Sequence, residues 1–109
     1  MKKVKINLSL NDYKITNDGY IKDNILILET DNQTITYIIN ENILIKENSD
    51  NIIKLDFNNN KVNCFLKEYQ KSFITNLNIK EKNINNNKIN ILYEIEDNLF
   101  NLNIEYEVK

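Results

Sequence analysis

The side chains in this sequence that could do chemistry are carboxylates, lysines, tyrosines and one thiol, because the chain contains no histidine. Without histidine, serine–histidine and cysteine–histidine nucleophiles and histidine-ligated metals are excluded. Gly19 is the single glycine, so the chain also lacks a phosphate-cradling loop and a dinucleotide fingerprint. These residue types predict a protein that is not an enzyme and that binds no cofactor.

Four glutamates near the C-terminus have spacings that could suggest acid–base pairs: Glu94, Glu96, Glu105 and Glu107. General acid–base catalysis needs burial or a close like charge to move a carboxyl pKa. In the strand pairing described below, these residues share a polar outer face, where carboxylates keep ordinary pKa values. We interpret them as a solvated acidic face balanced by lysines.

Asp56, Asn58 and Asn60 fall at the first three ligand spacings of a calcium-binding loop. However, Lys61 stands where that loop needs glycine, and Lys67 stands where it needs a bidentate glutamate. A cation bound there would face a lysine. The segment is therefore predicted to be an ordinary asparagine-rich turn, with no metal.

The length of 109 residues predicts one domain over residues 1–109. The single cysteine, Cys64, excludes an intramolecular disulfide, favours a reducing, cytoplasmic location, and is expected to be buried and unreactive. The net charge is −2 and all 14 basic residues are lysine, so nucleic-acid binding is not expected. No apolar run is long enough to cross a membrane.

Apolar and polar residues alternate along most of the chain, which predicts antiparallel strands with one face buried. The alternation is clearest over residues 100–108. A two-residue turn at Asp97-Asn98 would pair Tyr93 with Leu102 and Ile91 with Ile104. Every inward pair in that register is apolar.

The same construction applies earlier in the chain. A two-residue turn at Asp31-Asn32 would pair Leu28 with Ile35 and Leu26 with Tyr37. A three-residue turn over residues 40–42 would then pair Tyr37 with Ile45. Gly19 marks either a turn or a bulge. Strands at intervals of 8–12 residues predict an all-β sandwich or barrel.

Residues 61–72 permit a second interpretation. Val62, Phe65, Leu66, Tyr69 and Phe73 recur at spacings of three and four, which is a helical period. The chain has no alanine and is rich in β-branched residues, so a strand is favoured, with one helix as the alternative.

Several segments share an order of features with a known family: residues 19–22, 25–29, 34–37 and 54–57, then Tyr69, 73–79 and 89–95. This order resembles the YwiB-like family, small bacterial proteins of unknown function with a calycin, lipocalin-like barrel. The chain departs from the family at residues 70–73, where the usual threonine and glycine are absent. The resemblance implies that residues 61–72 form strand and that an antiparallel meander of about eight strands closes into a barrel. It implies no activity.

Five tyrosines are the candidate ligand-binding residues: Tyr37, Tyr93, Tyr106, Tyr20 and Tyr69. The first three fall on apolar, inward strand faces, and the last two are expected with them. A buried tyrosine hydroxyl needs a partner, a water or a ligand.

A barrel of eight strands is just wide enough for packed side chains or for one small ligand. We expect the interior to be filled, so the best hypothesis is a non-enzymatic protein that binds a small, partly apolar ligand at one barrel mouth. The alternative is a protein-interaction or self-associating β module with a solid core. Either protein would be a monomer or a homodimer.

Overall fold

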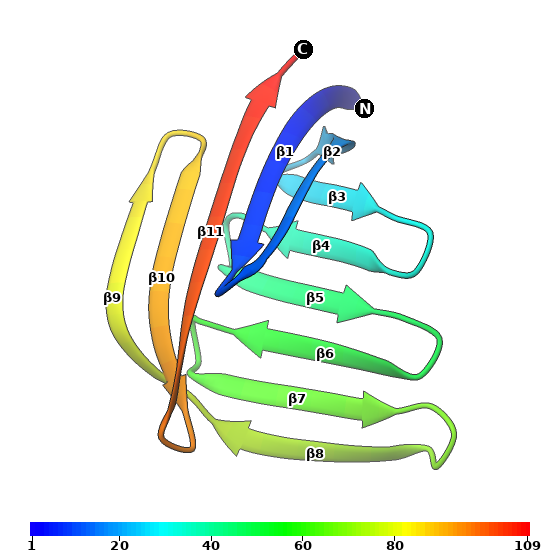
Figure 1. Cartoon of the computed structure of the whole chain (residues 1–109), viewed down its shortest axis with the longest axis vertical. Helices are drawn as coiled ribbons and strands as arrows, with labels where there is room; N and C mark the ends of the chain where they lie inside the picture. The colour runs from blue at the N-terminus through cyan, green and yellow to red at the C-terminus, as the bar shows by residue number, and fades with distance from the viewer.

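The computed structural model describes all 109 residues as eleven antiparallel strands without a helix (Figure 1). The strands are β1 Lys2–Leu10, β2 Tyr13–Lys22, β3 Ile25–Glu29, β4 Thr34–Ile38, β5 Ile43–Glu47, β6 Asn51–Asp56, β7 Lys61–Leu66, β8 Lys71–Asn76, β9 Asn78–Asn85, β10 Lys88–Ile95 and β11 Asn98–Val108. The predicted all-β antiparallel meander is confirmed. The barrel is larger than predicted, with eleven strands in place of about eight.

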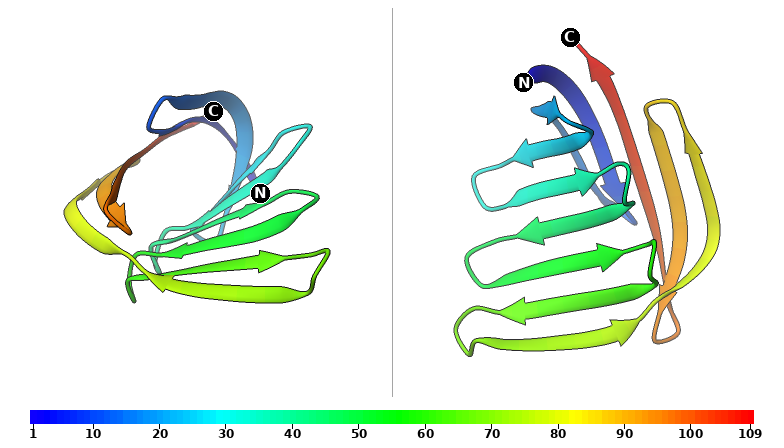
Figure 2. Two further views of the ribbon diagram at one scale, coloured as in Figure 1. Left: turned by 60° about the horizontal axis from the view of Figure 1, so that its bottom comes forward. Right: turned by 180° about the vertical axis from the view of Figure 1, so that it is seen from behind.

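The barrel is nearly closed and has two walls. The long strands β9, β10, β11, β1 and β2 form one wall, and the short strands β3 to β8 cross behind it as the other (Figures 1 and 2). In sheet order the strands run β8-β7-β6-β5-β4-β3-β2-β1-β11-β10-β9. The first and last strands of the chain therefore pair with each other, and the sheet ends at β8 and β9.

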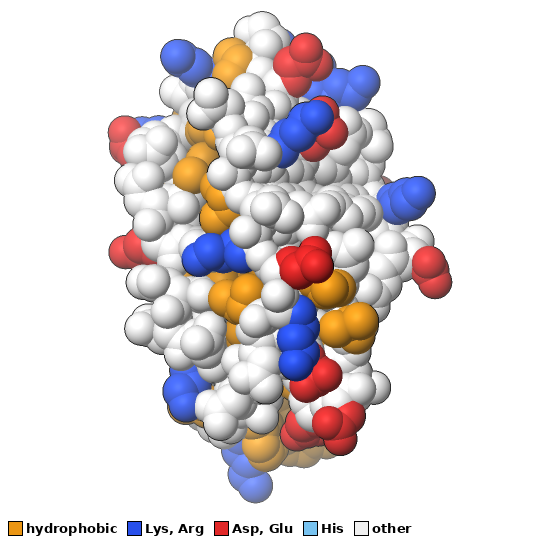
Figure 3. Space-filling view, turned by 90° about the vertical axis from the view of Figure 1, so that its left-hand side faces the viewer, with side chains coloured by type: hydrophobic (Ala, Val, Ile, Leu, Met, Phe, Trp, Pro, Cys, Tyr) orange, Lys and Arg blue, Asp and Glu red, His pale blue; other side chains and the backbone are white.

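The barrel stays open along the seam between β8 and β9, which follow each other in the chain but do not pair. Leu77, between them, is buried, and its N–H donates to the carbonyl oxygen of Asn60 at 3.1 Å. Leu77 thus separates β8, in the short-stranded wall, from β9, in the long-stranded wall. Residues 73–79, one of the segments that carry the family resemblance, are divided between these two strands. Figure 3 faces the β9 side and shows a broken stripe of hydrophobic side chains beside lysine and acidic groups.

The open edge of β9 carries two features that discourage pairing with another chain. Its register shifts by one residue where it pairs with Leu92 and Tyr93, which forms a β-bulge. Lys82 lies opposite the buried Ile91, on the inward face of the strand. Bulges and inward-facing charges both disfavour edge-to-edge association.

The core lies between the two walls, where the inward side chains of both pack into one cluster of 17 buried residues. Opposite residues of an antiparallel pair share a face, so alternation along each strand delivers every second residue to this cluster. The largest members are Tyr37, Tyr93 and Phe57.

The β3–β4 hairpin has the predicted register, with Leu28 opposite Ile35 and Leu26 opposite Tyr37. The next register is one residue away from the prediction, because Tyr37 lies opposite Leu44 and not Ile45. The connection has four residues, 39–42, where three were expected. Asn42 ends it with a φ of 55° and accepts a hydrogen bond from the Phe57 N–H at 3.1 Å. Leu44 consequently faces the core.

The β10–β11 turn is formed by Glu96 and Asp97, not by Asp97-Asn98. Both residues have positive φ, 48° and 67°, as in the type I′ turn that suits the twist of a hairpin. Tyr93 therefore lies opposite Phe100, and Ile91 lies opposite Leu102. The predicted register was wrong by two residues. Such a slip keeps every inward residue inward, so alternation alone does not detect it.

Residues 61–72 are extended, as favoured: β7 is followed by a turn over residues 67–70 and by the start of β8. Gly19 marks neither a turn nor a bulge, because it lies inside β2 opposite Val4. A Cβ at Gly19 would collide with the Ile27 carbonyl oxygen and would lie 2.6 Å from Ile6 Cδ1. Glycine is required there because backbone and core approach each other closely.

Candidate functional site

The structure separates the five tyrosines that the sequence analysis grouped together. Tyr37 and Tyr93 are buried, and Tyr106 is half-buried against the core. Tyr20 and Tyr69 do not face inward, which corrects the expectation: they are 41% and 65% exposed. Tyr20 lies opposite Ile27 on the outer face of the sheet, and Tyr69 belongs to the β7–β8 turn.

The Tyr37 hydroxyl is occupied within the protein. It donates a hydrogen bond to Oδ1 of Asn42, a buried residue in the four-residue connection that follows β4. The Asn42 Nδ2 atom is buried without a partner. Burial, together with the neighbouring Tyr106, raises the pKa of Tyr37 to about 12. The hydroxyl is thus a structural donor at neutral pH.

Tyr93 is held by aromatic contacts. Its ring centroid lies 5.1 Å from that of Phe57, edge to face, and 5.4 Å from that of Phe100, stacked. Both geometries are favourable for aromatic pairs. Burial raises the pKa of Tyr93 to about 12.

Beside Tyr37 the interior leaves little space for a small-molecule ligand. The space inside the walls between Tyr37 and Ile104 measures about 10 Å³ and is lined by apolar residues alone. That volume is about what one water molecule needs. Ligand contact by Tyr37 and Tyr93 stays a prediction, and it would require the core to open.

The C-terminal carboxylates lie where the sequence analysis placed them, apart from Glu96, which is in the turn. Glu94 forms a 3.9 Å ion pair with Lys80, and Glu105 forms one of the same length with Lys88. Surface pairs of this length contribute little to stability.

Asp56 forms the asparagine-rich turn predicted for its segment. Its Oδ1 accepts backbone hydrogen bonds from Asn58 at 3.0 Å and from Asn59 at 2.9 Å, and its Oδ2 accepts one from Asn59 Nδ2 at 2.9 Å. Partial desolvation raises the pKa of Asp56, but these hydrogen bonds outweigh it and the pKa is lowered. The carboxylate is committed to the turn, and no group of three or more Asp, Glu or Cys residues could hold a metal.

Cys64 is half-buried, not fully buried as expected. It lies on the inward face of β7, opposite Ile53 on one side and Phe73 on the other. Phe73 belongs to the edge strand and is 56% exposed, so the core thins out at this position.

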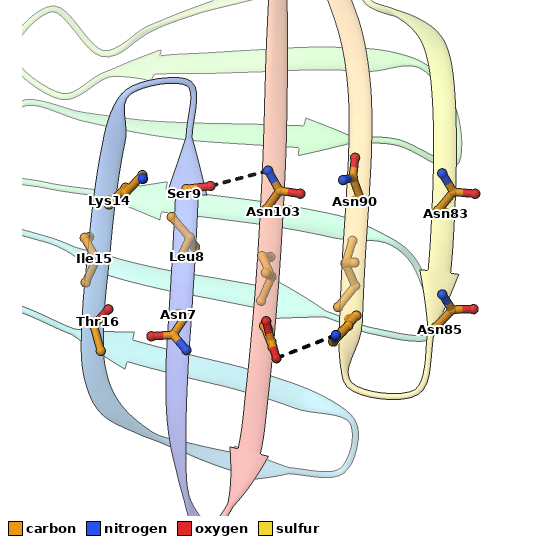
Figure 4. A pocket seen from close by; sticks show the side chains of 14 residues that line it. Asn7, Leu8, Ser9, Lys14, Ile15, Thr16, Asn83, Asn85, Asn90 and Asn103 are labelled. Carbon is orange, nitrogen blue, oxygen red and sulfur yellow. Dashed lines mark hydrogen bonds and ion pairs between the residues drawn. The ribbon is translucent and has the colours of Figure 1, made fainter.

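A shallow, open hollow of about 610 Å³ lies on the outer face of the long-stranded wall (Figure 4). Two rows of polar residues cross all five strands β2, β1, β11, β10 and β9 in register. The first row is Lys14, Ser9, Asn103, Asn90 and Asn83. The second row is Thr16, Asn7, Glu105, Lys88 and Asn85. We call these ten residues the polar hollow.

The polar hollow offers five amides, two hydroxyls, two ammonium groups and one carboxylate. Asn103 Nδ2 donates to Ser9 Oγ at 3.4 Å, and Lys88 forms its ion pair with Glu105 (Figure 4). Each amide presents both a donor and an acceptor to a ligand. The hollow therefore suits a neutral ligand with many hydrogen-bonding groups.

The polar hollow was not predicted from the sequence. Alternation does place its residues outward. Their convergence depends on the pairing of β1 with β11, two strands about 90 residues apart in the chain, and on the curvature of the sheet. The one signal in the sequence was the clustering of asparagine, serine and threonine at outward positions.

Comparison with known protein families, curated proteins and solved structures gives no match for this chain. The resemblance to the YwiB-like family therefore stays a prediction. No helix in this protein is long and apolar enough to span a membrane.

Proposed function

We propose that this protein is a non-enzymatic binding protein whose ligand, a small neutral molecule with several hydroxyl groups such as a mono- or disaccharide, binds in the polar hollow. One observation carries the proposal: ten polar side chains from five strands line a single hollow of about 610 Å³. Binding sites for small ligands typically have volumes of about 300–1,000 Å³.

The chemistry of the polar hollow favours such a ligand over other classes. Sugar hydroxyls donate and accept hydrogen bonds at once, as do the side chains of asparagine, serine and threonine. Lys14 and Lys88 are partly offset by Glu105, and the chain has no arginine to clamp a phosphate or carboxylate. The rows contain no aromatic side chain, which argues against the partly apolar ligand first expected.

The test is titration of the isotopically labelled protein with a panel of mono- and disaccharides, followed by NMR of the asparagine side-chain amides. We expect saturable shifts at Asn83, Asn90 and Asn103. The variant Asn90→Ala should bind about fivefold more weakly, since a lost hydrogen bond is worth about 1 kcal/mol.

The matched control is Asn63→Ala, which removes an amide from the outer face of β7, in the other wall. It should leave the affinity unchanged. The proposal fails if no saccharide at millimolar concentration shifts the hollow amides, or if Asn63→Ala weakens binding as much as Asn90→Ala does.

The calycin, lipocalin-like classification and the bacterial, cytoplasmic setting form part of this proposal. A meander in which neighbours in the chain pair everywhere except at β8 and β9, and the first strand pairs with the last, supports a relationship to up-and-down barrels. An experimental structure of a YwiB-like protein that superposes on this chain strand for strand would support the relationship, whereas a different strand order would end it.

A further inference from the structure

The short-stranded wall, β3 to β8, carries apolar residues on its outer face as well as on its inner face. Its inward residues join the core, and its outward residues include Ile25, Ile38, Ile43, Ile45, Ile52 and Phe65, which we call the apolar stripe. None of these six belongs to the connected core cluster. Ile43 is nevertheless buried among its neighbours, and the other five are half-buried. Figure 2 shows this wall from behind, and no other segment crosses its outer face. Antiparallel sheets with one solvated face normally carry polar residues there.

The strand registers place the apolar stripe diagonally across the wall. It begins at the row shared by Ile25, Ile38 and Ile43, passes Ile45, and ends at the opposite row with Ile52 and Phe65. The exposed Ile74 of β8 extends it to the sheet edge. A contiguous apolar face of this kind marks an interaction surface on a protein that is not embedded in a membrane.

Charged residues lie on the two sides of the apolar stripe and differ in sign. Glu29 and Glu47 lie on one side, in the row that continues through Ile52 and Phe65. Glu47 is already held in a 2.8 Å ion pair with Lys67, so Glu29 is the carboxylate on this side that has no ion pair within the chain. Lys54 and Lys61 lie towards the other side, on β6 and β7. Asp56 is near these lysines, but its carboxylate is taken up by its own turn.

We propose that the outer face of β3 to β8 is the interface of a homodimer, in which two copies stack face to face about a two-fold axis along the apolar stripe. Rotation about that axis lays each stripe on the other. It also lays the Glu29 and Glu47 side of one copy over the Lys54 and Lys61 side of its partner. The face is thus complementary to itself in both apolarity and charge, as an isologous interface requires.

The area of this outer face determines the dimer affinity that we expect. Six strands spaced about 4.8 Å apart, with five residues each at about 3.4 Å, cover roughly 25 by 17 Å. Two such faces, with their side-chain relief, bury an area at the low end of specific interfaces, about 1,000 Å². We therefore expect a dissociation constant in the micromolar range. The polar hollow lies on the other wall, so this inference is independent of the ligand proposal.

The test is sedimentation velocity of the full chain over a concentration series from about 1 to 500 µM. We expect a monomer–dimer transition within that range. Glu29→Lys and Lys61→Glu should each weaken the dimer at least tenfold, because each places like charges together across the interface. The double variant should recover most of the affinity, because it restores the pairing with the signs exchanged.

Both charge variants change exposed residues, so folding is not at risk, and circular dichroism at each concentration checks this. Lys5→Glu, on the outer face of the other wall, is the matched control and should leave the dimer unchanged. A monomer at 500 µM overturns the proposal. It is also overturned if the double variant associates no better than the single ones, since the contact would then be unspecific or would belong to a different protein.

Discussion

Tyr37 and Asn42 form the one buried hydrogen bond between two side chains in this protein. Tyr37→Phe would leave buried Asn42 with neither side-chain atom paired, because its Nδ2 already lacks a partner. An unsatisfied buried polar group costs about 1–3 kcal/mol, and we expect that loss in the free energy of unfolding measured with urea.

Tyr93→Phe is the matched control, because Tyr93 is held by ring contacts that phenylalanine keeps. It should cost less than about 1 kcal/mol. If the two variants lose equal stability, the hydrogen bond to Asn42 is not what holds the connection over residues 39–42.

The same two tyrosines predict a loss of stability at alkaline pH. Their pKa values are raised from 10.0 to about 12 in the folded protein. Between these values the unfolded chain has lost the phenol protons and the folded chain still holds them, so stability falls as pH rises. The stability that comes from keeping these two phenols protonated is fully present below pH 10. Urea unfolding at pH 8, 10 and 11 should show the decline, and the double variant Tyr37→Phe, Tyr93→Phe should decline less steeply over the same pH range.

At the scale of elements, hairpin turns fix the registers that side-chain alternation leaves open. Asp97 has a φ of 67°, in the left-handed region that glycine adopts without steric cost. Asp97→Gly should therefore stabilise the protein by about 0.5–1 kcal/mol in thermal or urea unfolding. Asp50→Gly, in a turn where the aspartate does not have positive φ, should destabilise it. Equal effects would contradict the turn geometry given for β10 and β11.

The faces of β7 explain why the apolar residues of segment 61–72 recur at a helical spacing although the segment contains no helix. Val62, Phe65 and Leu66 fit a period of 3.6, but Phe65 faces outward in β7 and belongs to the apolar stripe. A strand that is apolar on both faces loses its period of two, and chance spacings then resemble a helix. Tyr69 and Gln70 form a turn there, with a φ of 49° at Gln70.

At the scale of the whole molecule, both walls depend on one packed core. Leu102 of β11 is fully buried, whereas Leu99 in the same strand is 54% exposed. Leu102→Ala should cost about 2–5 kcal/mol of unfolding free energy, because it removes apolar contacts and leaves a cavity. Leu99→Ala should stay within about 0.5 kcal/mol of the natural protein. A small effect at Leu102 would mean that the two walls do not share a close-packed core.

The fold class, the approximate places of the turns and most of the inward residues followed from the sequence alone. Polar and apolar residues alternate with a period of two, and asparagine and aspartate pairs mark the reversals between strands. Leu26, Leu28, Ile91 and Ile104 all face the core as expected, even though two of them have different partners from those predicted. The face of a residue is a local property, decided by its place in its own strand.

Only the tertiary structure decided the hairpin partners, the number of strands, the closure of β1 on β11, the polar hollow and the exposed outer face of β3 to β8. A shift of two residues preserves every face, so alternation does not choose between Ile104 and Leu102 as the partner of Ile91. Pairing across about 100 residues and the curvature that gathers Asn7, Asn90 and Asn103 around one hollow depend on how the twisted walls pack. A surface site on such a barrel therefore depends on how several strands pair and curve together, and no single strand contains it.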